Sequence, residues 1–174
     1  WMIPCVRGAT WIGNEMSEHK DFKCVDVRTS EGLKHVAELL HDEYLDVRQI
    51  SYDSQQGLLE IHFKRIFHEG PRKVIKNRLI YRIEEVEILR GYLRFKGVVD
   101  FELRDREQIE TYSFDDFQFD PSQGVLTIYC CPNCKLLLHV REIDAEYREV
   151  EYRGKARITQ GWWWDSVPGA PGEE

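Results

Sequence analysis

The sequence predicts a mainly β protein, α+β at most, with one helix. Its expected architecture is an antiparallel sandwich or a rolled, barrel-like sheet made from two related hairpin units. The first observation behind this prediction is a period of two. Between residues 58 and 66, Leu59, Ile61 and Phe63 fall on one face of a strand, and polar or charged residues fall on the other. This alternation is typical of a half-buried antiparallel strand.

The second observation is an internal match. Residues 51–63 align with residues 118–130 without a gap, and five aligned pairs are identical: Asp53 and Asp120, Gln56 and Gln123, Gly57 and Gly124, Leu59 and Leu126, and Ile61 and Ile128. Turn chemistry alone makes many hairpins resemble one another. Here the turn residues and the inward apolar positions agree together, which favours a structural repeat of roughly residues 22–90 and 91–164. We expect the shared leucines and isoleucines at equivalent buried positions.

One helix is expected at about residues 31–41. Ser30 is a good N-cap, because its hydroxyl can accept a hydrogen bond from an amide of the first turn. Apolar residues then follow at helical spacing and form one stripe: Leu33, Val36, Ala37 and Leu40.

Further strands are expected at residues 22–28, 47–52, 58–66, 78–89, 92–104, 109–119, 125–131, 135–152 and 156–164. The apolar phase changes within residues 78–89, and a β-bulge at Glu84-Glu85 would restore it. Upstream of the matched hairpins, Val47 aligns with Phe114. The 174 residues are expected to form one domain over residues 1–166, followed by a flexible Pro/Gly-rich tail at residues 167–174.

Composition narrows the classes of function. The chain has 24 basic and 31 acidic residues and a formal net charge of −7. Such a surface repels nucleic-acid phosphates, so we expect no nucleic-acid partner. The sequence contains neither a membrane-spanning apolar run nor a secretory signal within its first ten residues. We therefore expect no membrane partner. The odd number of cysteines, five, does not suggest a disulfide framework and favours a reducing cytoplasm.

The most prominent motif is Cys131-Pro-Asn-Cys134. Two such thiols supply half of a tetrahedral zinc site, or a redox pair. Few residues elsewhere could complete a zinc site: Cys5, Cys24 and His139. We therefore expect no metal and no cofactor; if a metal did bind, its ligands would be Cys131, Cys134 and His139. The hairpin alignment instead makes Pro132-Asn133 a short turn and Cys130 a core thiol.

No catalytic residue is assigned. His41-Asp42 lacks the further ligands of a metal-dependent phosphohydrolase. Glu84-Glu85 and Asp115-Asp116 could form carboxylate pairs for acid–base or glycosidic chemistry, but charged runs are common on exposed strand faces. There is no Gly-rich phosphate loop and no nucleophile elbow. An enzyme is the less favoured class.

Two stretches carry opposite charge. Between residues 64 and 78, six basic residues accompany Glu69 alone: Lys64, Arg65, Arg72, Lys73, Lys76 and Arg78. Between residues 100 and 120, eight acids accompany only Arg104 and Arg106. Such a polarised molecule can orient a partner. We hypothesise that the acidic stretch binds a basic protein through four residues: Asp100, Asp115, Asp116 and Asp120.

A family resemblance supports a binding role. The segments His41-Asp-Glu-Tyr-Leu45, Ile50-Ser-Tyr-Asp53 and Leu58-Leu-Glu-Ile-His-Phe63 resemble small bacterial β-rich domains of the YxiG-like and toxin-immunity type. The resemblance covers residues 41–63, with a partial echo at 109–130. It implies a non-catalytic protein that acts by binding, and it carries over no site residues.

The expected function is therefore a non-enzymatic, immunity-like protein-binding domain. The alternative is a small hydrolase or a carbohydrate-binding module that uses carboxylates and the Trp162–Trp164 cluster. The oligomeric state is left open.

Overall fold

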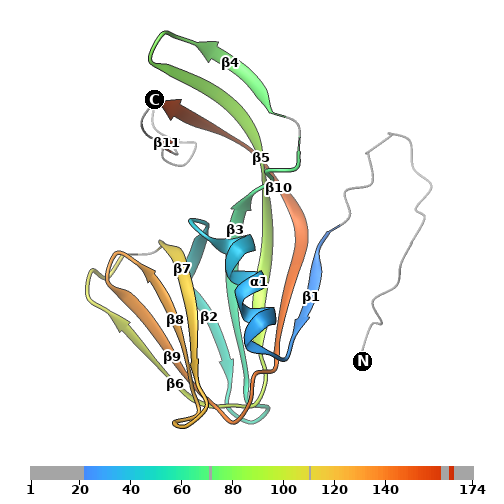
Figure 1. Ribbon diagram of the computed structural model, residues 1–174, viewed down its shortest axis with the longest axis vertical. Coiled ribbons are helices and arrows are strands. Elements are labelled where there is room, and N and C mark those ends of the chain that lie inside the picture. Colours follow the sequence, from blue (N-terminus) through green and yellow to red (C-terminus); the bar gives the residue numbers. More distant parts are fainter. Residues whose placement is uncertain (1–21, 71, 110, 162–164, 167–174) are drawn as a thin grey trace, which may run out of the picture.

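The described part of the chain forms one antiparallel sheet and one helix (Figure 1). The computed structural model describes residues 22–70, 72–109, 111–161 and 165–166. The elements are β1 (Cys24–Val27), α1 (Ser30–Leu40), β2 (Tyr44–Asp53), β3 (Leu58–Ile66), β4 (Lys73–Asn77), β5 (Tyr81–Phe95), β6 (Val98–Asp105), β7 (Thr111–Asp120), β8 (Val125–Cys131), β9 (Cys134–Val140), β10 (Ala145–Gly161) and β11 (Asp165–Ser166). The predicted mainly β fold class is confirmed.

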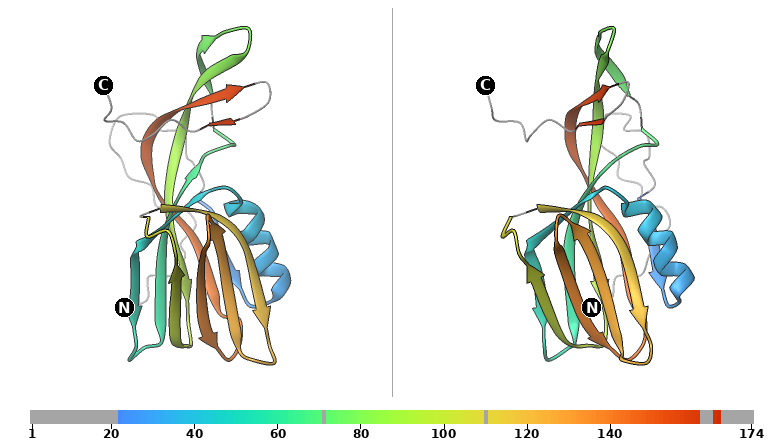
Figure 2. Two further views of the ribbon diagram at one scale, coloured as in Figure 1. Left: turned by 90° about the vertical axis from the view of Figure 1, so that its left-hand side faces the viewer. Right: turned by 60° about the vertical axis from the view of Figure 1, so that its left-hand side comes forward.

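The strands pair in the order β1-β10-β5-β3-β2-β7-β8-β9-β6, with β4 beside β5 and β11 beside β10. Every pair is antiparallel. The sheet is open, and it curls so that its two halves face each other (Figure 2). Their inner faces share one apolar core, in which Phe95 of β5 meets Phe117 of β7 at 6.4 Å between ring centroids. The arrangement is sandwich-like.

The β2–β3 and β7–β8 turns are built alike. In each turn the aspartate Oδ1, of Asp53 or Asp120, accepts hydrogen bonds from the amides two and three residues further on. Each turn then needs a left-handed residue, with φ of 61° at Gly57 and 63° at Gly124. Glycine adopts this conformation without steric cost. The matching residues of the two segments therefore have the same structural role in their turns.

The matched apolar positions are equivalent as well. Four of them lie in the core at no more than 1% exposure: Leu59, Ile61, Leu126 and Ile128. The register around both turns is the same, because Ile50 lies opposite Ile61 and Phe117 lies opposite Ile128. The prediction that these residues are buried at equivalent places is confirmed.

Further from the turns the two hairpins diverge, because their bulges differ in size. The β2–β3 register skips three residues of β2, whereas the β7–β8 register skips one residue of β7. As a result, Leu45 lies opposite Phe63, while Phe114 lies opposite Cys130. The expected equivalence of Val47 with Phe114 is wrong for this reason.

The helix α1 begins at Ser30, and its N-cap is Thr29 rather than the expected Ser30. Thr29 Oγ1 accepts a hydrogen bond from Gly32 N at 3.1 Å and so satisfies one amide of the first turn. Three residues of the apolar stripe are buried in the core: Leu33, Val36 and Leu40. The helix packs against β7 and β1 (Figure 1). None of the helical structure in the described ranges is long and apolar enough to cross a membrane.

Strand β5 runs unbroken through Gly91, where the sequence suggested a turn between residues 78–89 and 92–104. The turn lies later, at Gly97, whose φ is 69°. A Cβ at Gly91 would lie 2.2 Å from Arg148 O and 2.3 Å from Phe63 Cζ. Gly91 therefore permits a close approach of β10 and of an aromatic ring inside the sheet. Glycine in a strand can mark such a close approach as well as a turn or bulge.

Gly91→Ala is expected to destabilise the protein by about 2 kcal/mol, because the added methyl group overpacks a contact with backbone. At Gly97 a Cβ would meet nothing within 4 Å. Gly97→Ala should therefore carry only the cost of a left-handed backbone, about 1 kcal/mol. Urea unfolding of the two variants measures the difference. An equal loss in both would contradict the close-approach role of Gly91.

The β-bulge expected at Glu84-Glu85 is absent. Strand β5 pairs with β10 in continuous register over residues 82–87, and the irregularities lie in β4 and β10 instead. Strand β5 tolerates its change of apolar phase because both of its faces are covered in turn. Val86 is buried on one face and Leu89 on the other.

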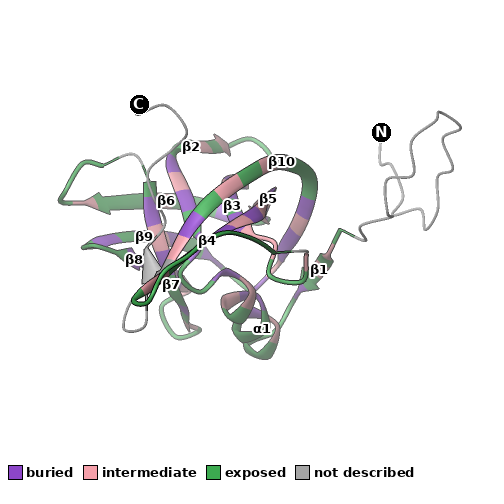
Figure 3. Ribbon diagram, turned by 90° about the horizontal axis from the view of Figure 1, so that it is seen from above, coloured by how far each residue is buried: buried purple, intermediate pink, exposed green. Residues whose placement is uncertain are grey.

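The long strands β5 and β10 continue past the body of the sheet and carry β4 and β11 with them (Figure 1). We call residues 73–87 and 155–161 the arm. The strand expected at residues 135–152 is divided between β9 and β10, and β10 begins at Ala145 and runs without a break through residues 153–155, where the sequence suggested a gap. Exposed and buried segments alternate along β10 in Figure 3, while β4 is exposed over its whole length. The arm thus presents side chains away from the shared core.

Candidate partner-binding site

Two of the predicted aspartates lie at the bulge of β7. Phe114 and Phe117 are both buried, and Asp115 and Asp116 between them are both exposed. In a regular strand, consecutive side chains point to opposite faces. The register shift between Phe114 and Asp116 removes this alternation, so the two carboxylates are exposed side by side.

These aspartates border an open hollow between α1 and β7. Its lining consists of Lys34, Ala37, Glu38 and His41 from the helix and Asp115 and Asp116 from the strand. Backbone hydrogen bonds hold the two walls together, including Asp42 N to Phe114 O at 3.1 Å. Three carboxylates around the hollow, against one lysine and one histidine, suit a cationic side chain.

The other two predicted aspartates lie elsewhere. Asp120 ends β7, about 16 Å along the strand from Asp115. Asp100 lies on β6, the edge strand of this half. Through the strands between them, Asp120 and Asp100 fall in one transverse row of the outer surface. The structure therefore brings Asp115 and Asp116 together and leaves the other two apart from them.

Several acids of the stretch have structural partners. Asp120 Oδ1 accepts from Ser122 Oγ at 2.6 Å and from Ser122 N at 2.9 Å, and these hydrogen bonds lower the pKa of Asp120. Glu102 pairs with Arg104 at 2.8 Å. Asp105 accepts from the amide three residues further on at 2.7 Å. In each case part of the carboxylate is already engaged within the fold, and Arg104 offsets the charge of Glu102.

The cysteine motif forms a hairpin turn. Cys130 and Cys134 face each other across β8 and β9 and are buried, whereas Cys131 is exposed. The hydrogen bond with the Cys134 thiol, together with burial, raises the pKa of Cys130. His139 is exposed. Cys131, Cys134 and His139 do not converge, and within the described ranges no three His, Cys, Asp or Glu side chains form a metal-ligand group.

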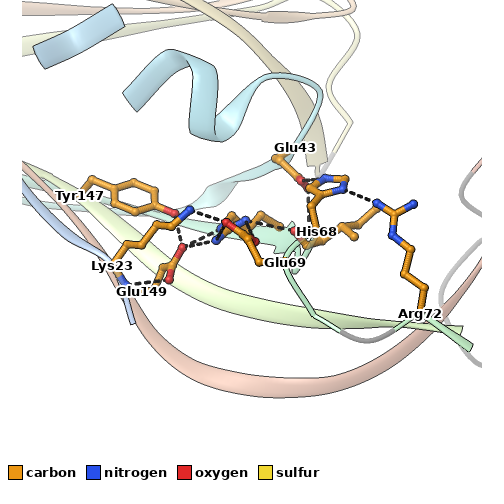
Figure 4. A network of polar contacts seen from close by, with 9 residues as sticks. Lys23, Glu43, His68, Glu69, Arg72, Tyr147 and Glu149 are labelled. Atoms are coloured by element: carbon orange, nitrogen blue, oxygen red, sulfur yellow. Dashed lines mark hydrogen bonds and ion pairs between the residues drawn. The ribbon is translucent and has the colours of Figure 1, made fainter. Parts of the chain in front are cut away.

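Sequence reasoning missed a buried polar network where the body meets the arm (Figure 4). Arg65 and Glu149 form a buried ion pair, with 2.7 Å between Arg65 Nε and Glu149 Oε1. Tyr147 donates to the same oxygen at 2.8 Å, and Lys23 N donates to Glu149 Oε2 at 2.8 Å. The spacing of residues could have indicated the burial of Arg65. It follows the inward-facing Phe63 by two residues and therefore lies on the same buried face of β3.

Glu43 is the second buried acid of this network. Its Oε2 accepts from Ile66 N at 2.9 Å, and its Oε1 lies 3.2 Å from His68 Nε2. Burial raises the pKa of Glu43 to about 7. Burial, and then the charges of Arg72 and Arg65, lower the pKa of His68. Glu43 can exchange a proton near neutral pH, but both of its oxygens hold structural partners that join β3 to the segment before β2.

The remaining carboxylate candidates are ion-paired. Glu84 is buried and lies 2.6 Å from Arg82, and Glu85 lies 3.0 Å from Lys155. The Trp162–Trp164 cluster of the alternative function lies outside the described residues.

Comparison of the chain with protein-family models, with curated proteins and with solved structures finds no match. The role of the protein is therefore inferred from its own fold and surface.

Proposed function

We propose that the protein is a non-enzymatic protein-binding domain, and that a basic partner places a lysine or arginine side chain in the hollow between α1 and β7. The observation that carries this proposal is the β7 bulge, which exposes Asp115 and Asp116 side by side. Bulges are common where a strand re-aims side chains for function. Glu38 on the opposite wall adds a third carboxylate around the same hollow.

These carboxylates are expected to act mainly on the rate of association. Exposed ion pairs add little net affinity, but complementary charge steers two proteins into register before contact. A cytoplasmic immunity protein that binds a basic toxin is the specific form of this proposal, in line with the family resemblance of residues 41–63.

Asp115→Asn combined with Asp116→Asn is expected to slow association with the partner about fivefold at low salt, because steering by opposite charge is lost. Partners are isolated by affinity capture on the immobilised protein. The association rate of the purified partner is then measured for wild type and variant at low and high salt. The difference between the two should shrink at high salt, because screening already weakens steering of the wild type.

A matched control removes the same charge elsewhere. Asp100→Asn with Asp120→Asn should slow association clearly less, because these charges lie apart from the hollow, and asparagine at 120 can still form the turn. Equal slowing by both double variants would mean that the whole outer acidic surface, and not the hollow, steers the partner. An unchanged rate in the Asp115/Asp116 variant for every captured partner would exclude the hollow as the binding site.

A further inference from the structure

The end of the arm carries large apolar side chains in solvent. Leu79 and Ile80, in the turn between β4 and β5, are 91% and 68% exposed. Val74 and Ile75 of β4 are 48% and 43% exposed. Soluble proteins keep such residues together on a surface chiefly where the surface binds something. The tip is therefore a candidate binding surface separate from the hollow.

The turn at the tip is an ordered part of the sheet. Arg78 N donates to Tyr81 O at 2.8 Å, which closes the turn. Strand β4 pairs with β5 on one side, and β10 pairs with β5 on the other. Leu79 and Ile80 are therefore held at the end of a hydrogen-bonded projection.

Basic residues lie along the arm behind the apolar tip. The arm contains six of them: Lys73, Lys76, Arg78, Arg82, Lys155 and Arg157. It contains three acids, of which Glu84 is paired with Arg82 and Glu85 with Lys155. The arm thus has a net positive charge, whereas the whole chain has a formal net charge of −7. The positive charge is concentrated behind the exposed leucine and isoleucine.

The shape of the tip favours a flat partner. Figure 1 shows the β4–β5 end projecting away from the body, so a flat surface can reach this end without meeting the body of the sheet. A membrane surface rich in anionic lipid offers both interactions that this end needs. Its headgroups attract lysine and arginine, and its headgroup–acyl boundary accepts apolar side chains.

We propose that the arm binds anionic membrane surfaces, with Leu79 and Ile80 at the headgroup–acyl boundary and the basic residues of the arm at the headgroups. From the sequence we expected no membrane partner, chiefly because no apolar run is long enough to span a bilayer. Insertion of a hairpin tip into a membrane surface requires no spanning segment. This proposal does not depend on the hollow, and the two sites can be tested separately.

The test uses the full chain and sedimentation with vesicles of phosphatidylcholine, with or without about 30% phosphatidylserine. Wild type should bind the anionic vesicles at least about tenfold more strongly than the neutral ones, and added salt should weaken this binding. Ile80→Asp should reduce binding to anionic vesicles at least about tenfold, because it places a like charge at the apolar boundary. Val99→Asp is the matched control, because Val99 on β6 is also 68% exposed and the substitution adds the same charge. It should bind like wild type.

Charge is tested by a second variant. Lys73→Gln with Lys76→Gln should weaken binding to anionic vesicles several-fold without touching the apolar turn, which guards against an effect of Ile80→Asp on folding. The proposal is wrong if wild type does not sediment with anionic vesicles, or if Ile80→Asp and Val99→Asp bind alike. It is also wrong if the wild type instead self-associates in solution and Ile80→Asp abolishes this self-association. The tip would then bind a second copy of the chain.

Discussion

Glu149→Ala is expected to lower the free energy of unfolding by about 3–5 kcal/mol, because it leaves a buried charge without its partner. The Arg65 side chain is 3% exposed and would keep its charge in the protein interior. Its remaining acid, Glu69, lies 3.3 Å away and is itself partly exposed. The Tyr147 hydroxyl and Lys23 N would lose their acceptor as well. Urea unfolding followed by circular dichroism measures the loss.

Two controls isolate the cause. Glu102→Ala removes an exposed acid that also pairs with arginine, and it should cost much less, because solvent screens an exposed ion pair. Arg65→Met combined with Glu149→Leu removes both charges and should recover most of the loss, because two well-packed apolar side chains replace a desolvated pair. A double variant as unstable as Glu149→Ala would show that the unpaired charge is not the cause, and that packing or the lost acceptor of Tyr147 and Lys23 N is.

The hairpins were predictable because their information is local. The turns need an aspartate to accept two amides and a glycine with positive φ, and both requirements are visible at Asp53, Gly57 and their counterparts. The neighbouring strands then follow from the alternation of apolar residues. This local pattern was sufficient to place Leu59 and Ile61 in the core.

The long strands were not predictable from local signals. From the sequence alone, Gly91 looks like a turn residue. Glycine is needed there because β10, more than fifty residues away in sequence, approaches it closely. In the same way, the change in apolar phase along β5 predicts a bulge only if one face of the strand is exposed to solvent. The covering of both faces depends on the tertiary arrangement of the arm.

The candidate site was partly visible. Phe114 and Phe117 are both apolar at a spacing of three, which a regular strand cannot bury on one face. A bulge at Asp115 and Asp116 is one way to bury both rings. Val86 and Leu89 of β5 have the same spacing and are instead buried on opposite faces without a bulge. The hollow itself requires α1 to pack on β7, and no sequence pattern in either element specifies this contact. Asp120 lies apart from the hollow, at the end of β7, where its Oδ1 accepts from Ser122 N and Gln123 N.

Glu43→Gln is expected to remove a pH dependence of stability near neutrality. The folded protein holds the pKa of Glu43 at about 7, whereas its ordinary value is 4.5. Between these values the folded state binds a proton that the unfolded state releases, so stability falls as pH rises from about 4.5 to 7. The contribution lost amounts to at most about 3 kcal/mol. Wild type and variant should be similar at pH 4.5, and the variant should be the more stable at pH 8.

His68 contributes a slope of the opposite sign and must be separated. Burial lowers its pKa below the ordinary value of 6.5, so the unfolded state gains a proton first and stability falls as pH decreases through this range. The comparison is therefore made by urea unfolding in two backgrounds, wild type and His68→Gln. Glu43→Gln should flatten the decline toward pH 8 in both, because the glutamine amide can still accept from Ile66 N and carries no charge at any pH. A decline that persists in both Glu43→Gln proteins would mean that another group takes up the proton and that Glu43 is ionised in the folded state.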